Sequence, residues 1–102
     1  MSRRIIWAPR AAKDFFQQLE YVSRDGPQNA ELVGQRVLDR VAALAHMATG
    51  RAGRVFGTYE IHVPKTSMII SYELPDAKTL HVLRLIHAAR DWPGGGWPED
   101  GE

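Results

Sequence analysis

The sequence lacks cysteine, and this absence excludes several kinds of chemistry. Without a thiol, none of the 102 residues can form a disulfide, act as a cysteine nucleophile or bind a metal through a thiolate. No apolar run approaches the roughly 20 residues that a membrane-spanning helix needs. Near the N-terminus, Pro9 and Arg10 interrupt the chain before an apolar stretch typical of a signal peptide has formed. A chain of this length supports one domain, and we expect a cytoplasmic protein.

The common catalytic motifs are also missing. The sequence contains no phosphate-binding loop of the form GxxxxGK[ST], no zinc motif HExxH and no nucleophile elbow GxSxG. Four histidines are present, but their spacing is not that of metal ligands. His81 and His87 lie six residues apart on one predicted strand. At about 3.3 Å per residue they are separated by about 20 Å. We therefore predict neither a metal site nor a cofactor.

Charges are nearly balanced over the whole chain, with 13 Lys and Arg residues against 12 Asp and Glu residues. This net charge of +1 argues against a strongly basic nucleic-acid binder. The distribution is uneven, however, because residues 91–102 hold four of the acids and no base, which leaves a net charge of +5 on residues 1–90. Most of the chain is therefore more basic than the average indicates, and this suits an acidic partner.

The end of the chain has a composition unlike the rest. Residues 91–102 read DWPGGGWPEDGE and combine acidic residues with glycine and proline. We expect a domain over residues 1–93 and a flexible acidic tail over residues 94–102. The alternative is that Trp92 and Trp97 dock on the domain, since exposed indoles are unfavourable.

The first half of the chain predicts a short strand and two helices. Residues 3–7 alternate in a way typical of a strand. Pro9 suits the first turn of a helix, and apolar residues then recur every three or four positions up to the stop signal Asp-Gly-Pro at residues 25–27. The same periodicity predicts a second helix from near Asn29 to near Gly50. The short link between the helices predicts an antiparallel helical hairpin.

The second half has the alternation of β-structure. Apolar residues, many of them β-branched or aromatic, recur at every second position over Thr58–Val63, Ser67–Leu74 and Thr79–His87, and this predicts three strands. Short links with turn residues separate the strands, so neighbouring strands are expected to be antiparallel. The resulting order is β-α-α-β-β-β. It predicts an α+β domain in which the helical hairpin packs on a small, mostly antiparallel sheet.

Basic residues in the second half are candidate functional groups. Arg84 lies in an otherwise apolar strand, where a charge requires a partner or access to water. We predict a cross-strand ion pair of Arg84 with Glu60 and Glu73. The alternative is that Arg84 borders a groove for an acidic ligand or a phosphate. Arg51 and Arg54 lie in a glycine-rich segment, either as solvated loop residues or as ligands for phosphate or carboxylate.

Several segments resemble one known family. Residues 54–60 (RVFGTYE) and 68–72 (MIISY) carry part of the resemblance, and residues 80–93 (LHVLRLIHAARDWP) carry its most specific part. Residues 7–15 (WAPRAAKDF) are similar to the first strand and helix entry of the same family. Over residues 3–93, the chain resembles the ParE/RelE superfamily of bacterial toxins from toxin–antitoxin modules. The resemblance implies a helical hairpin on an antiparallel sheet, in agreement with the order derived above.

The resemblance implies one of two activities. One branch of the superfamily cuts messenger RNA on the ribosome, and the other, ParE-like, inhibits DNA gyrase and cuts nothing. The nuclease pattern is incomplete here. The position of the family's arginine in the third strand corresponds to about Ile69, which is apolar, and the only basic residues near the position of its paired lysines are Arg51 and Arg54. The family's arginine near the C-terminus matches Arg90, and His87 is the only candidate here for the family's C-terminal acid–base residue. We therefore expect a ParE-like gyrase inhibitor that is not an enzyme. A ribosome-dependent endoribonuclease and an inert toxin-like binding module are the alternatives.

The resemblance also implies which residues act. For a nuclease, the catalytic candidates are Arg54, Arg84, His87 and Arg90. For contacts with a target or partner, the candidates are Arg51, Arg54, Tyr59, Glu60, Arg84, His87, Arg90 and Trp92. The implied partner is a small, acidic, ParD-like antitoxin, which would complement the basic domain and cover apolar residues exposed between the hairpin and the sheet. No helix-turn-helix fits the predicted elements, so DNA binding is expected of the antitoxin and not of this chain.

Overall fold

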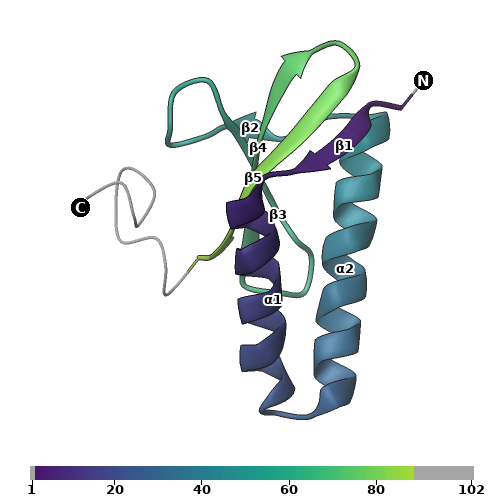
Figure 1. The fold of residues 1–102 in the computed structure, drawn as a ribbon, viewed down its shortest axis with the longest axis vertical. Helices are drawn as coiled ribbons and strands as arrows, with labels where there is room; N and C mark the ends of the chain where they lie inside the picture. The colour runs from purple at the N-terminus through teal and green to yellow at the C-terminus, as the bar shows by residue number, and fades with distance from the viewer. Residues whose placement is uncertain (1, 89–102) are drawn as a thin grey trace.

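A computed structural model describes residues 2–88 as two helices packed on a five-stranded sheet (Figure 1). In chain order the elements are β1 (Arg4–Trp7), α1 (Pro9–Ser23), α2 (Pro27–His46), β2 (Arg51–Ala52), β3 (Tyr59–His62), β4 (Met68–Asp76) and β5 (Thr79–His87). The predicted α+β architecture is confirmed, and the two-residue strand β2 is an addition that no alternation indicated. The predicted tail, Trp92 and Trp97 lie outside the described residues.

The sheet is mixed, with the strand order β1-β5-β4-β3-β2. β1 pairs with β5 in parallel, and the other pairs are antiparallel. The short links predicted this for β3–β4 and β4–β5, while the β2–β3 pair was not predicted. The helices run antiparallel to each other in the connection between β1 and β2 (Figure 1). The hairpin thus carries the chain from one edge of the sheet to the other.

Both helices begin at a proline, Pro9 in α1 and Pro27 in α2, where the missing N–H has no helical partner to lose. Gly26 makes the turn between them with a φ of 126°, which residues with a side chain rarely adopt. α2 ends at His46, earlier than the predicted end near Gly50, because the next residue is already extended (φ −148°, ψ 106°). Neither described helix combines the length and the apolar character that crossing a membrane requires.

The core lies between the helices and the sheet. The sheet contributes side chains with almost no exposed surface, which are Ile70, Tyr72, Leu80, Val82 and Leu85. The helices contribute the buried residues Ala11, Val37, Val41 and Leu44. The rings of Trp7 and Phe15 lie against this cluster, with their centroids 5.5 Å apart. The inward faces of both helices therefore pack in the core.

Among the described residues, only the first half of β5 has a strand on the β1 side. β1 pairs with Thr79–Val82, and its ladder ends there. Beyond that point α1 packs against β5, and the carboxylate of Asp14 accepts a hydrogen bond from the backbone N–H of Leu85 at 3.1 Å. A buried side chain of α1 therefore satisfies a backbone donor that lacks a strand partner on this side.

Candidate functional site

Arg84 makes an ion pair with Asp14 of α1, with Nε lying 2.8 Å from Oδ2. A second guanidinium nitrogen lies 3.4 Å from Oδ1, and both side chains are almost fully buried. The predicted cross-strand pair of Arg84 with Glu60 and Glu73 is therefore wrong. The charge of Arg84 is balanced inside the protein, so this arginine does not border a surface groove.

The strand register explains the difference. Arg84 lies opposite Ser71 in the β4–β5 ladder, whereas Glu73 lies opposite His81. The carboxylate of Glu73 bonds to Nδ1 of His81 at 2.9 Å. Strand alternation identifies residues on one face, but register decides which of them meet.

The sequence did contain a signal for Asp14. This residue follows Ala11 by three positions and precedes Gln18 by four, and all three are buried on α1. A carboxylate on the buried stripe of a helix needs a cationic or hydrogen-bonding partner in the core. An apolar strand with a lone arginine was the natural place to look for that partner.

The β2–β3 hairpin brings together three predicted site residues, Arg51, Arg54 and Glu60. Arg51 lies opposite Glu60 in the ladder. The buried carboxylate of Glu60 accepts a hydrogen bond from the backbone N–H of Arg54 at 2.8 Å. The N–H of Gly53 donates to the carbonyl of Thr58 at 2.8 Å and closes the loop. Glu60 therefore has a structural role, since it holds the loop that carries the exposed Arg54.

The same loop presents Phe56, whose side chain is fully exposed. Phe56 lies in a β-turn that is closed by the N–H of Thr58 on the carbonyl of Val55 at 3.1 Å, and Gly57 follows with a φ of 83°. Sequence reasoning missed Phe56, because an aromatic residue beside a strand usually belongs to the core. A large apolar side chain on a closed turn suits contact with another protein.

Tyr59, another predicted contact residue, stacks on Tyr72 with ring centroids 5.6 Å apart. Tyr72 is fully buried, and its hydroxyl accepts a hydrogen bond from the backbone N–H of Gly50 at 2.8 Å. Burial raises the pKa of Tyr72 above its usual value, although the Gly50 N–H and the charges of Arg3 and Arg40 act in the opposite direction. The stacked pair therefore anchors the segment before β2 to the centre of the sheet.

The raised pKa of Tyr72 predicts a loss of stability at alkaline pH. Above pH 10.0, the usual value, the unfolded chain loses this proton while the folded protein retains it. The contribution is thus complete below the unfolded pKa and is lost as the pH rises through the folded pKa. Urea unfolding at about pH 8 and about pH 11 measures the loss. We expect a smaller decrease for Tyr72→Phe, and an equal decrease in both proteins would contradict this assignment.

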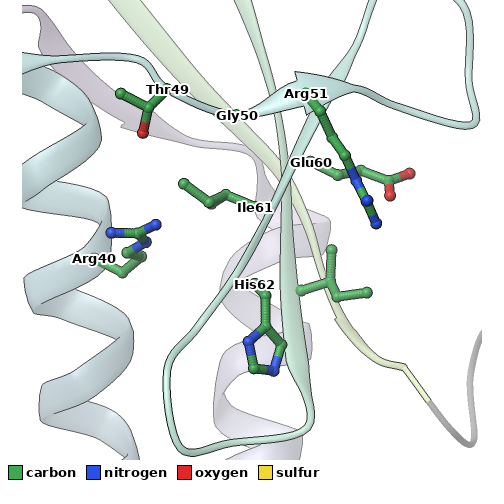
Figure 2. Close-up of a pocket in the computed structure, with 8 residues that line it drawn as sticks. Arg40, Thr49, Gly50, Arg51, Glu60, Ile61 and His62 are labelled. Atoms are coloured by element: carbon green, nitrogen blue, oxygen red, sulfur yellow. The ribbon is translucent and has the colours of Figure 1, made fainter.

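A pocket of about 240 Å³ lies between α2 and the outer edge of β3 (Figure 2). Its lining includes Arg40 of α2, Thr49 and Arg51 around the start of β2, and Ile61 and His62 of β3. Figure 2 shows the guanidinium of Arg40 directed from the helix toward the strand. Its Nε atom is buried and has no hydrogen-bond partner among the described residues. Sequence reasoning passed over Arg40, because an arginine on the polar face of a helix is usually solvated.

Of the four nuclease candidates, the structure describes Arg54, Arg84 and His87, and it places them at different positions of the sheet. Arg54 lies in the loop that leads into β3, whereas His87 lies opposite Met68 in the β4–β5 ladder, where β4 begins. Arg84 lies in its buried pair, and Arg90, like Trp92, falls outside the described residues. In residues 2–88, no group of three or more acidic or histidine side chains is arranged to hold a metal ion.

An apolar groove of about 690 Å³ runs along the helical hairpin. Its lining includes Phe15 and Leu19 from α1 and Leu32 and Leu38 from α2. A Cβ atom at Gly34 would lie 3.3 Å from the Leu19 side chain, so glycine permits a close approach of the helices here. This groove lies on the hairpin itself, and the predicted antitoxin contact between the hairpin and the sheet stays a prediction.

Comparison with known proteins identifies the family. Residues 5–92 match the family described as the ParE toxin of the type II toxin-antitoxin system, parDE. The chain belongs to the ParE toxin family. A curated relative named "Putative toxin Y4kP", from Sinorhizobium fredii, is 35% identical to this ParE toxin over 95 residues, which cover 91% of this chain and 97% of the relative.

A solved structure has the same fold as this ParE toxin. It is titled "Chromosomal ParDE TA system from P. aeruginosa" and matches with a TM-score of 0.76 over 84% of this chain and 96% of that chain. The sequence identity is 20%, so the likeness shows the fold alone. The match includes the order β-α-α-β-β-β and confirms the expectation drawn from the resemblance. The protein is a ParE-like toxin of a type II toxin–antitoxin system.

Proposed function

We propose that this ParE toxin acts by binding DNA gyrase and inhibiting it, without cutting a nucleic acid itself. The observation that carries the proposal is the buried ion pair of Arg84 with Asp14 at 2.8 Å. Phosphodiester cleavage requires a base, an acid and stabilisation of the developing charge at one place. The charge of Arg84 is already balanced in the interior, and the apolar Ile69 supplies none. This leaves protein binding as the activity that the described surface supports best.

DNA supercoiling by purified gyrase tests this proposal. We expect added toxin to slow supercoiling at micromolar concentration and to accumulate cleaved DNA–gyrase complexes, with heat-denatured toxin as the control. Toeprinting of translating ribosomes in parallel tests the alternative endoribonuclease. Cleavage of messenger RNA without any effect on gyrase would overturn the proposal. Neither effect, together with normal growth after induced expression, would favour the inert binding module.

We further propose that a small acidic antitoxin neutralises the toxin by covering the apolar groove of the hairpin. Leu32 and Leu38 line this groove, and about half of each side chain is exposed. Exposed apolar grooves between helices suit the apolar face of a partner helix. The charge of +5 on residues 1–90 complements an acidic chain. We expect the toxin to accumulate in soluble form only when this partner is coexpressed, and abundant soluble toxin alone would count against it.

A negative charge in the apolar groove is expected to weaken antitoxin binding. Leu38→Glu places a carboxylate on the groove wall, and we expect affinity to fall by about 10- to 100-fold. Gln17→Glu adds the same charge on an exposed position of α1 outside the groove lining and is expected to change affinity by less than about threefold. Titration calorimetry with the acidic protein from the neighbouring reading frame measures both. Equal affinities of the two variants would place the antitoxin elsewhere.

A further inference from the structure

Two adjoining cavities form a basic groove along the side of α2 that faces β3. The pocket of about 240 Å³ in Figure 2 is one of them, and a cavity of about 370 Å³ between α2 and the β3–β4 turn is the other. Arg40 lines both cavities, so they meet at its side chain. Arg51 lines the first cavity, whereas Arg36 and Lys65 line the second. These four residues define what we call the α2–β3 groove.

The cations of the α2–β3 groove are not matched by the acids that line it. Asp39 and Glu60 are the lining acids, and each already accepts a hydrogen bond. Asp39 accepts one from the side-chain amide of Gln35 at 2.8 Å, and Glu60 accepts the loop N–H described above. Arg36 donates to the backbone carbonyl of Lys65 at 3.5 Å. Among the described residues, no carboxylate lies within ion-pair distance of the four cations, so the groove is suited to an anionic ligand.

β3 has a free backbone edge on the side of this groove. β2 pairs with Tyr59 and Glu60 and begins at Arg51, so no described strand continues beside the rest of β3. The N–H and C=O directions in an antiparallel ladder repeat every two residues. The backbone of His62 therefore faces the same side as that of Glu60 and opens toward the groove that His62 lines. An open strand edge is a template for another chain.

We propose that the α2–β3 groove binds an acidic extended segment of a partner protein, which adds to β3 at His62 as a further strand and places carboxylates on Arg40 and Arg36. Alternate residues of the added strand are separated by about 6.6 Å. Arg36 and Arg40, four positions apart on α2, are separated by about 6 Å, so two alternate carboxylates match the two arginines. Backbone hydrogen bonds would supply affinity, and alternate carboxylates would supply specificity. This inference rests on the proposed function in one respect, because the antitoxin is the acidic partner that would supply the segment.

A nucleic acid is a weaker candidate for the same groove. Binding of a single strand combines phosphate contacts with stacking of bases on aromatic side chains. No Phe, Tyr or Trp of the described chain lines either cavity. The free edge of β3, in contrast, offers donors and acceptors that only a polypeptide backbone matches in register. The charge and the strand edge together favour an acidic peptide.

A synthetic peptide of about ten residues with alternating Glu and Val tests the proposal, using toxin released from its coexpressed complex. We expect the peptide to slow hydrogen exchange of the His62 amide by about tenfold, as measured by NMR, and to bind less tightly at high salt. Arg40→Glu and Arg36→Glu are each expected to weaken binding by about tenfold. Lys78→Glu makes the same charge change in the exposed β4–β5 turn and is expected to weaken it by less than about twofold.

Other results would overturn the proposal. Peptide affinity that is equal in Arg40→Glu and Lys78→Glu would show that the groove does not bind it, and Arg40→Gln serves where charge reversal lowers the melting temperature. Protection of His62 by an RNA of about ten nucleotides, but not by the peptide, would assign the groove to nucleic acid. Peptide binding and hydrogen exchange are measured without gyrase. Failure of gyrase inhibition therefore leaves the groove assignment standing, and failure of peptide binding leaves the proposed target standing.

Discussion

Replacing Asp14 by alanine is expected to lower the free energy of unfolding by about 3–5 kcal/mol. The substitution leaves the guanidinium of Arg84 buried without its partner at 2.8 Å and removes the acceptor of the Leu85 N–H. A buried charge without a counter-charge is costly because desolvation is no longer offset. A domain of this size has a total stability of about 5–15 kcal/mol, so the variant loses a large fraction of it. Urea or thermal unfolding followed by circular dichroism measures the change.

Two further variants test the cause of this loss. Arg10 also contacts Asp14, at 3.4 Å, but its side chain is 44% exposed. Arg10→Ala is therefore expected to cost about 1 kcal/mol or less. The double variant Asp14→Leu with Arg84→Met replaces the ion pair by apolar groups and is expected to recover much of the stability. A double variant as unstable as Asp14→Ala would show that the unsatisfied Leu85 N–H, and not the unpaired charge of Arg84, causes most of the loss of stability.

Replacing Gly50 by alanine is expected to cost about 3 kcal/mol, because it overpacks a site that cannot expand freely. The added Cβ atom would collide with the hydroxyl of Tyr72 and lie 2.8 Å from the backbone carbonyl of Glu60. Any shift that relieves the collision also lengthens the hydrogen bond from the Gly50 N–H to Tyr72. Since Gly50 precedes β2 directly, we also expect faster hydrogen exchange in the β2–β3 hairpin.

A double-mutant cycle separates the contributions at Gly50. Tyr72→Phe alone leaves the Gly50 N–H without its acceptor and is expected to cost about 1–2 kcal/mol. Combining it with Gly50→Ala also removes the hydroxyl with which the Cβ collides, so the combined cost is expected to be smaller than the sum. Strict additivity would mean that the backbone of Glu60 or the ring of Tyr72, and not the Tyr72 hydroxyl, opposes the added methyl group.

The elements of this fold were predictable because their signals are local. Proline and the Asp-Gly-Pro stop position the two helices, and period-two alternation positions β3, β4 and β5. β2 was not predictable, since two residues cannot show an alternation, and it forms only because Arg51 and Ala52 lie beside β3. The early end of α2 at His46 has a similar cause. The chain must reach β2 in an extended form, and helical periodicity carries no information on that constraint.

Part of the candidate site followed from the sequence as well. Arg51, Arg54 and Glu60 were singled out, and the structure brings them together in one hairpin. Phe56 and Arg40 were missed because general statistics place a phenylalanine in the core and an arginine of a helix on the solvated surface. In the structure Phe56 is exposed, and the Nε atom of Arg40 is buried. Their positions depend on a closed turn and on the gap between α2 and β3, which are features of packing.

The sequence by itself determined the order of every element except β2, the ParE-like character of the chain and the concentration of positive charge in residues 1–90. Tertiary structure alone decided that Arg84 pairs with Asp14, 70 positions away along the chain, and that the apolar groove lies on the hairpin. It also decided that Arg40 faces the open edge of β3 and that Arg36 lies beside the β3–β4 turn. The physical reason is that residue spacing specifies the face of an element, whereas the partner of that face depends on how the elements pack.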